Sequence, residues 1–199
     1  MSSVDEVVAA VVDGGLVVIP TDTVYGLACR PDSEECAHTL SVLKGRPPGQ
    51  PIALVATSVE ALLELVPELP AGLLRGLLPG PFTLVVSNPA HRLAWLTGAR
   101  PDTIGLRVPE VSGPVAAMLE RVGVVAATSA NLHGGPEPSR LSDVPAEILD
   151  HVAAALDGGE LPGMPSTVLD LTGSAPRVLR EGVVPTAEAL ERGADALSQ

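Results

Sequence analysis

The segment VVIPTDTVYGLACR (residues 17–30) joins a short apolar run to several small polar side chains. The run LVVIP (residues 16–20) is apolar throughout, which predicts a short strand that is buried on both faces. Thr21, Asp22, Thr23 and Tyr25 follow it at once, in a chain with only three aromatic residues. Polar groups at the end of a buried strand are typical of ligand sites in α/β proteins. A plain turn, in which Asp22 bonds the nearby backbone, is the alternative.

The residues on either side of this segment predict helices. On the N-terminal side, valines recur at helical spacing after Ser3, with Glu6 three residues on, so we expect a helix over residues 3–13 that begins with a capping box. On the C-terminal side, residues 32–43 carry acids in their first turn and predict a second helix.

Farther along, short apolar runs alternate with helical patterns. We expect strands over residues 52–55, 82–87, 103–108, 122–127, 152–156, 167–170 and 177–179, and helices over residues 58–65, 70–78, 113–121 and 145–150. Several strands lie too close together for helical crossovers, so the expected fold class is α/β, a mixed parallel and antiparallel sheet flanked by helices. We expect one domain over residues 1–199, with a core from about 7 to 185 and a weakly ordered C-terminal tail from about 186 to 199.

The composition limits the classes of function. The formal net charge is −12 and Lys44 is the single lysine, which disfavours a protein that coats nucleic acid through many phosphate contacts. Cys29 and Cys36 have no partners at metal-ligand spacing, so we expect reduced thiols and no metal site built by the protein alone. The first residues lack the positive charges of a signal peptide, and no apolar run approaches about 20 residues, so we expect a cytoplasmic protein without a membrane segment.

Seven small polar clusters stand at the ends of the apolar runs: PTDTVYG, KGRPPGQP, PGPFT, TIGLRVP, TSAN, PSTV and LREG. They supply four cations, Lys44, Arg46, Arg107 and Arg180, and neutral hydrogen-bonding groups, namely Thr23, Tyr25, Thr103, Ser129, Asn131, Ser139 and Ser166. Such a set suits an anionic ligand with phosphate or carboxylate groups. The motifs GxxxxGK(S/T), GxGxxG, HExxH, GxSxG and CxxC are all absent from the sequence. Each cluster by itself is also compatible with a turn or a helix cap, and only their joint order favours a site.

In this order the clusters resemble the YrdC/Sua5 family, over residues from about 7 to 185. The resemblance implies a single-domain form whose twisted sheet curls around a concave cavity. It also implies a threonylcarbamoyl-AMP synthase, a nucleotidyltransferase that makes threonylcarbamoyl-AMP and pyrophosphate from L-threonine, bicarbonate and ATP. Mg²⁺ would be held mainly by the ATP phosphates. The product would serve threonylcarbamoyl-adenosine modification next to the anticodon of tRNA, through downstream threonylcarbamoyl-transferase proteins.

The resemblance further implies a role for each polar residue. Lys44 and Arg46 would be the catalytic cations. The L-threonine site would consist of Thr23, Tyr25, Arg107, Ser129 and Ser166, and the nucleotide site of Lys44, Arg46, Gln50, Thr103, Asn131, Ser139 and Arg180. The chain departs from the family pattern at Val55, where histidine is usual, and at His133-Gly134, where serine-glycine is usual.

Two other interpretations stay open. An RNA-binding module of the same fold would bind tRNA or double-stranded RNA directly. A net charge of −12 argues against extensive RNA binding but leaves room for a local patch. A paralogue, such as a carbamoyl-adenylate domain of the hydrogenase-maturation type, would use the same fold without a threonine-sized pocket.

Overall fold

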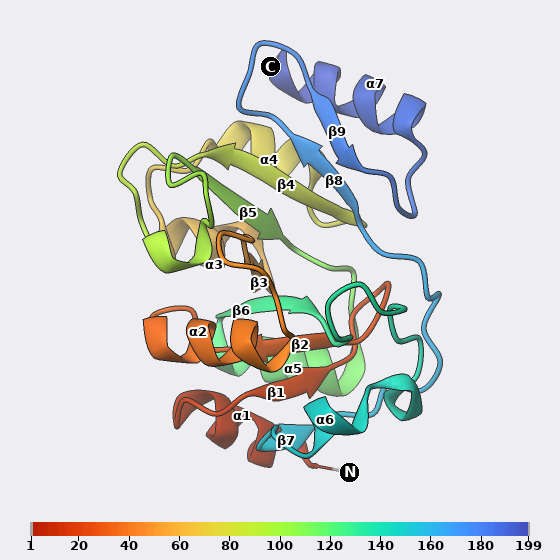
Figure 1. The fold of residues 1–199 in the computed structure, drawn as a ribbon. Helices are drawn as coiled ribbons and strands as arrows, with labels where there is room; N and C mark the ends of the chain where they lie inside the picture. The colour runs from red at the N-terminus through yellow and green to blue at the C-terminus, as the bar shows by residue number, and fades with distance from the viewer. Residues whose placement is uncertain (1, 199) are drawn as a thin grey trace.

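The protein is built on one mixed sheet, seen in a computed structural model that describes residues 2–198 (Figure 1). Within this range nine strands pair in the order β7-β1-β2-β6-β3-β5-β4-β8-β9. The strands are β1 (Val17–Ile19), β2 (Gly26–Cys29), β3 (Ala53–Ala56), β4 (Phe82–Ser87), β5 (Thr103–Arg107), β6 (Val124–Ser129), β7 (Ala154–Ala155), β8 (Thr167–Asp170) and β9 (Arg177–Arg180). The pairs β1–β7, β3–β5 and β4–β8 are parallel and the other neighbours are antiparallel, which confirms the predicted mixed sheet.

The helices are α1 (Val4–Val12), α2 (Glu34–Leu43), α3 (Val59–Leu65), α4 (Ala71–Leu77), α5 (Gly113–Val122), α6 (Ala146–Leu149) and α7 (Thr186–Leu197), with two 3-10 turns, η1 (Ala94–Leu96) and η2 (Leu141–Asp143). The predicted capping box begins α1. The backbone N–H of Ser3 donates to Glu6 Oε2 at 2.6 Å, and the backbone N–H of Glu6 donates to Ser3 Oγ at 3.3 Å. Within residues 2–198, no helix combines the length and the apolar composition that crossing a membrane requires.

Alternation of side chains along the strands gives the sheet two different faces. On one face, Leu54, Leu84 and Leu106 are fully buried in the larger core cluster, to which α2, α3, α4 and α7 contribute. On the other face, α1 and α5 cover the β1, β2 and β6 part, where Val125 packs with Met118. Figure 1 shows α1, α6 and β7 at one end of the sheet and β8, β9 and α7 at the other. The β3, β5, β4 and β8 part of the second face forms the wall of a cavity.

Strand β2 is absent from the sequence prediction. Its four residues are all buried, and it pairs antiparallel with β1 on one edge and β6 on the other. The segment is short, begins with glycine and follows a turn, so local propensity gives no strand signal. Pairing on both edges overrides that propensity, and the PTDTVY segment becomes the loop of a β1–β2 hairpin.

The sequence predicts a weakly ordered tail over residues 186–199, of which residue 199 lies outside the described residues. The structure corrects this prediction, because α7 packs on β8 and α4 through small residues, Ala189, Gly193 and Ala196. A Cβ on Gly193 would lie 2.8 Å from Pro176 Cβ and 2.9 Å from Leu169 Cδ2, so any larger side chain would force these neighbours to shift. The Arg192 guanidinium lies 4.7 Å from the centroid of the Phe82 ring, a cation–π contact that adds to the anchoring.

Candidate active site

A cavity of about 380 Å³ opens on the second face of the sheet. Every second residue of the neighbouring strands contributes to its wall: Ala53 and Val55 of β3, Thr83 and Val85 of β4, and Thr103, Gly105 and Arg107 of β5. Other segments complete the wall with Arg46, Ser129, Glu137, Ser166 and Arg180. The size lies within the range of small-molecule sites, about 300–1,000 Å³.

Arg107, the last residue of β5, is held by the segment that follows β1. Its Nη2 atom donates to Asp22 Oδ1 and, at 2.7 Å, to Thr23 Oγ1. The Arg107 side chain is 9% exposed. Asp22 Oδ2 accepts a hydrogen bond from the backbone N–H of Glu110 at 3.1 Å, so the carboxylate is itself fixed. The PTDT segment therefore orients a buried arginine, while Thr21 Oγ1 also accepts the backbone N–H of Thr23 at 3.2 Å as a turn would require.

Lys44 and the TSAN segment form one hydrogen-bond network. Lys44 caps the C-terminus of α2, and its Nζ donates to Ser129 O and, at 3.1 Å, to Asn131 Oδ1. Asn131 Oδ1 also accepts from Ser129 Oγ at 2.6 Å. Burial, together with the nearby charge of Arg46, lowers the pKa of Lys44 to about 7. The ammonium is thus close to its titration midpoint at neutral pH, and an adjacent anion would favour its protonated form.

Arg46 reaches the cavity from the loop after α2. Its Nε donates to Gln50 Oε1 at 3.1 Å and its Nη2 to Pro51 O at 2.8 Å. These two contacts fix the plane of the guanidinium, so Gln50 positions Arg46 instead of forming the cavity wall. Burial lowers the pKa of Arg46, but a guanidinium stays protonated in proteins.

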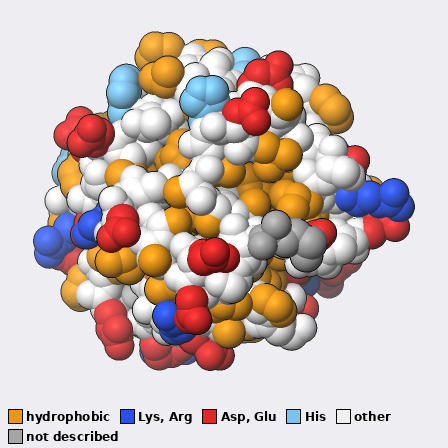
Figure 2. All heavy atoms as spheres, turned by 90° about the horizontal axis from the view of Figure 1, so that it is seen from below, with side chains coloured by type: hydrophobic (Ala, Val, Ile, Leu, Met, Phe, Trp, Pro, Cys, Tyr) orange, Lys and Arg blue, Asp and Glu red, His pale blue; other side chains and the backbone are white. Residues whose placement is uncertain are grey.

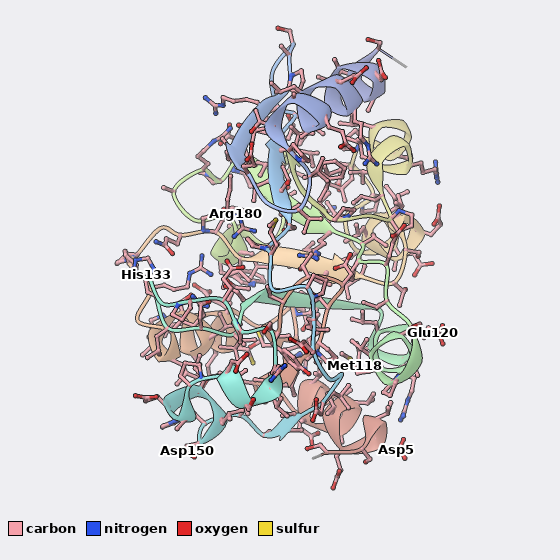
Figure 3. All side chains as sticks on the ribbon, turned by 90° about the vertical axis from the view of Figure 1, so that its right-hand side faces the viewer. Asp5, Met118, Glu120, His133, Asp150 and Arg180 are labelled. Atoms are coloured by element: carbon pink, nitrogen blue, oxygen red, sulfur yellow. The ribbon has the colours of Figure 1, made fainter. Side chains whose placement is uncertain are left out.

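Arg180, the last residue of β9, lies about midway between α7 and α1 in Figure 3. Its Nη2 donates to Ser166 O at 2.9 Å, and its Nη1 lies 3.4 Å from Glu137 Oε1. Ser166 Oγ is 2.8 Å from Thr83 Oγ1. This side of the wall therefore carries a cation and two hydroxyl groups in contact with each other.

Three buried side-chain atoms have no hydrogen-bond partner among residues 2–198, and all three belong to residues of the cavity wall: Arg46 Nη1, Arg107 Nε and Glu137 Oε2. An unpaired buried polar group costs about 1–3 kcal/mol, so such groups are ordinarily satisfied. Two free donors on fixed guanidinium groups suit an anionic ligand that enters the cavity.

The structure brings most of the predicted site residues to this cavity. On its wall lie Arg46, Thr103, Arg107, Ser129, Ser166 and Arg180. Four others do not line the cavity, but each forms a hydrogen bond with a residue that does: Thr23, Lys44, Gln50 and Asn131. The four cations of the sequence analysis thus converge, three on the wall and Lys44 through Ser129.

Tyr25 and Ser139 are not brought to the wall. Tyr25 is fully buried, and its hydroxyl lies 2.8 Å from Gly159 O and accepts the backbone N–H of Gly158 at 2.9 Å. Ser139 Oγ donates to Asp143 Oδ2 at 3.2 Å, beside η2. Both hydroxyls thus form hydrogen bonds within the protein. The Tyr25 hydroxyl bonds the loop that precedes β8, and the Ser139 hydroxyl bonds a residue of the adjacent turn.

Some wall residues are absent from the sequence prediction. Thr83 lies in the quoted PGPFT cluster, and its alternation with the buried Phe82 and Leu84 could have placed it on the cavity face. Glu137 lies in a proline- and glycine-rich loop with no periodicity that would place its side chain. Val55, where the family pattern has histidine, contributes with Val85 to an apolar part of the wall.

Comparison with known protein sequences gives consistent matches. The family model described as "Telomere recombination" (Sua5_yciO_yrdC) matches residues 9–182. The chain is 39% identical over 197 residues to a putative threonylcarbamoyl-AMP synthase of Mycobacterium tuberculosis, covering 96% of this chain and 89% of the relative. It is 35% identical over 182 residues to the threonylcarbamoyl-AMP synthase of Pyrococcus abyssi, covering 88% of this chain and 53% of that protein.

Solved structures match the fold over nearly the whole chain. Pyrococcus abyssi Sua5 complexed with L-threonine has a TM-score of 0.82 at 31% identity, covering 95% of this chain and 56% of that one. Escherichia coli YciO has a TM-score of 0.80 at 28% identity, covering 94% and 92%. HypF in a phosphate- and nucleotide-bound form has a TM-score of 0.74 at 21% identity, covering 92% and 29%, which shows similarity of fold alone.

Proposed function

The chain belongs to the Sua5/YciO/YrdC family, and from that premise we propose that it is an L-threonylcarbamoyladenylate synthase, a nucleotidyltransferase. It would convert L-threonine, bicarbonate and ATP into threonylcarbamoyl-AMP and pyrophosphate. The observation that carries this proposal is the pair of buried, unpartnered nitrogens, Arg46 Nη1 and Arg107 Nε, on the wall of one cavity. The name of the Pyrococcus abyssi relative and the Sua5 structure with L-threonine support it.

Threonine would lie against β5 and the TSAN and PSTV segments. Arg107, held by Asp22, is the natural partner of the substrate carboxylate, because its buried Nε is a charged donor without a partner among the described residues. Ser129 and Ser166 supply hydroxyl groups on the same wall. A site that pairs the carboxylate, amine and hydroxyl of its substrate rejects analogues that lack one of them.

The nucleotide phosphates would lie against Arg46, Arg180 and the protonated form of Lys44. The threonine amine adds to bicarbonate with loss of water, which gives a carbamate. A carbamate oxygen then attacks the α-phosphorus of ATP, the bond to the β-phosphate oxygen breaks, and pyrophosphate leaves with that electron pair. Charge on the phosphate oxygens would be stabilised by cations that the fold already holds in place. Mg²⁺ would be held mainly by the ATP phosphates and would reduce their negative charge.

The product would pass to a threonylcarbamoyl-transferase protein that acts on tRNA. Direct tRNA binding is not favoured by the face that carries α1, β7 and α6. There acidic side chains are scattered over the surface and basic ones lie mostly toward the edges (Figure 2). A polyanion is repelled by such a surface.

The test is synthesis of threonylcarbamoyl-AMP by the purified protein, measured as pyrophosphate release and by mass of the product. Product should require ATP, bicarbonate and L-threonine together, with L-serine used about tenfold or more less efficiently because it lacks one methyl group. Lys44→Ala and Arg46→Ala should abolish turnover, whereas Arg75→Ala, on the exposed surface of α4, should not. Pyrophosphate release that ignores threonine and bicarbonate, or full activity of Arg46→Ala, would overturn the proposal.

A further inference from the structure

Glu137 is a carboxylate on a wall whose other charged residues are arginines. Among the described residues that line the cavity it is the only acidic one. Its Oε1 lies 3.4 Å from Arg180 Nη1, whereas its Oε2 is buried and accepts no hydrogen bond. The chemistry proposed above assigns this residue no role.

The surroundings of Glu137 are those expected to hold phosphate. Burial lowers the pKa values of Lys44 and Arg180, and the negative charge of Glu137 partly opposes this lowering at both residues. Glu137 is therefore close enough to interact electrostatically with both. A carboxylate in this position repels the polyphosphate of a metal-free nucleotide. A cation placed between the two negative groups converts this repulsion into attraction.

Oxygen ligands of this kind fit Mg²⁺. In nucleotide sites Mg²⁺ is usually bound through one or two carboxylates together with substrate phosphates. Among residues 2–198 no group of three His, Cys, Asp or Glu side chains could hold a metal ion, so the ion would enter with the nucleotide. Glu137 Oε2, a buried acceptor without a partner on the cavity wall, fits such a mixed shell.

We propose that Glu137 is the protein ligand of the divalent cation that enters with ATP, and that it makes nucleotide binding depend on the cation. The site then accepts the metal–polyphosphate complex and excludes the metal-free nucleotide. This inference rests on the proposed function, because it places the phosphates beside Arg180 and Lys44.

The experiment is calorimetric titration of the full chain with a non-hydrolysable ATP analogue, in excess Mg²⁺ and in EDTA. Three proteins are compared: wild type, Glu137→Gln and Glu160→Gln. Glu160 is a matched control, because its carboxylate pairs with Arg140 at 2.7 Å as Glu137 does with Arg180, but it lies outside the cavity wall. Thermal melts verify that each variant folds.

In Glu137→Gln the ratio of affinities with and without Mg²⁺ should fall by about tenfold, the lower end of losses seen when a metal shell is disturbed. The variant should bind the metal-free analogue more tightly than wild type does, because the repulsion is gone. Paramagnetic resonance of Mn²⁺ gives a second readout. Free Mn²⁺ should not bind alone, and the Mn²⁺–analogue complex should show a changed signal in Glu137→Gln but not in Glu160→Gln.

A Glu137→Gln variant that keeps the wild-type ratio, with affinity changed equally in both conditions, would overturn the inference, because Glu137 would then only hold Arg180. In that case the proposed function would stand. If the wild type binds the analogue in neither condition, the proposed function fails and this inference fails with it.

Discussion

Replacing Lys44 by methionine should change how the stability of the protein depends on pH. In the folded protein, burial lowers the pKa of the Lys44 ammonium to about 7. A lysine in an unfolded chain has a pKa of about 10.4. Between these values the unfolded chain holds the proton and the folded chain has released it. Because the unfolded state binds more protons there, the free energy of unfolding rises with pH through this window.

The two pKa values set the size of the effect. Where the unfolded chain holds one full proton more than the folded chain, each pH unit adds about 1.4 kcal/mol to the free energy of unfolding. The folded state is already half deprotonated at about pH 7. The free energy of unfolding should therefore rise by roughly 2 kcal/mol between about pH 7 and about pH 9. Methionine keeps most of the packing of the Lys44 stem but has no proton to lose. The variant should therefore lack this contribution.

Urea denaturation at the two pH values measures the difference directly. Other groups that titrate in this range contribute equally to wild type and variant. Arg121→Met is the control, because it removes an exposed cation that pairs with Asp5 on the surface. Wild type and Arg121→Met should gain roughly 2 kcal/mol more than Lys44→Met. Equal gains in all three proteins would refute the reasoning, since Lys44 would then titrate like an exposed lysine.

Other predictions follow from single contacts. Asp22→Asn leaves the buried Arg107 without its counter-charge, so it should lower the free energy of unfolding by about 3 kcal/mol. It should also raise the KM for threonine. An unchanged midpoint of urea unfolding would contradict this prediction. Tyr25→Phe removes a hydroxyl bonded to the loop at residues 157–159 and should cost about 1–3 kcal/mol in urea unfolding with both substrate KM values unchanged. Ser139→Ala should leave nucleotide affinity within about twofold of wild type in the calorimetric titration, because its hydroxyl bonds Asp143; a tenfold loss would place it in the site.

The predicted elements agree with the structure where the signal is local. The capping box at Ser3 and Glu6 and the apolar run of β4 are both found where the sequence predicts them. Strand β2 and the anchoring of α7 depend on partners far away in the chain. For β2 these partners are the strands on both sides, and for α7 they include Leu169 under Gly193. The β2 segment carries no periodic pattern of its own, and the packing face of α7 consists of the small residues Ala189, Gly193 and Ala196, which carry little hydrophobic signal.

The candidate site divides in the same way. The cations and hydroxyls are recognisable from their places after apolar runs, and Arg46, Arg107 and Arg180 do line one cavity. Their exact functions are not readable from spacing. Asp22, 85 positions before Arg107, serves to orient it, and Gln50 serves to orient Arg46.

By itself, the sequence determined the mixed α/β class and the single domain, because periodicity and residue type are properties of neighbouring positions. Tertiary structure alone decided which polar residues line the cavity and which hold their neighbours in place. Tyr25 and Glu137 illustrate this. The Tyr25 hydroxyl donates to Gly159 O, in a loop far away in the sequence, whereas Glu137 Oε2 has no partner among the described residues. A hydrogen bond is satisfied by whatever group the fold brings within about 3 Å, and that group can come from anywhere in the chain.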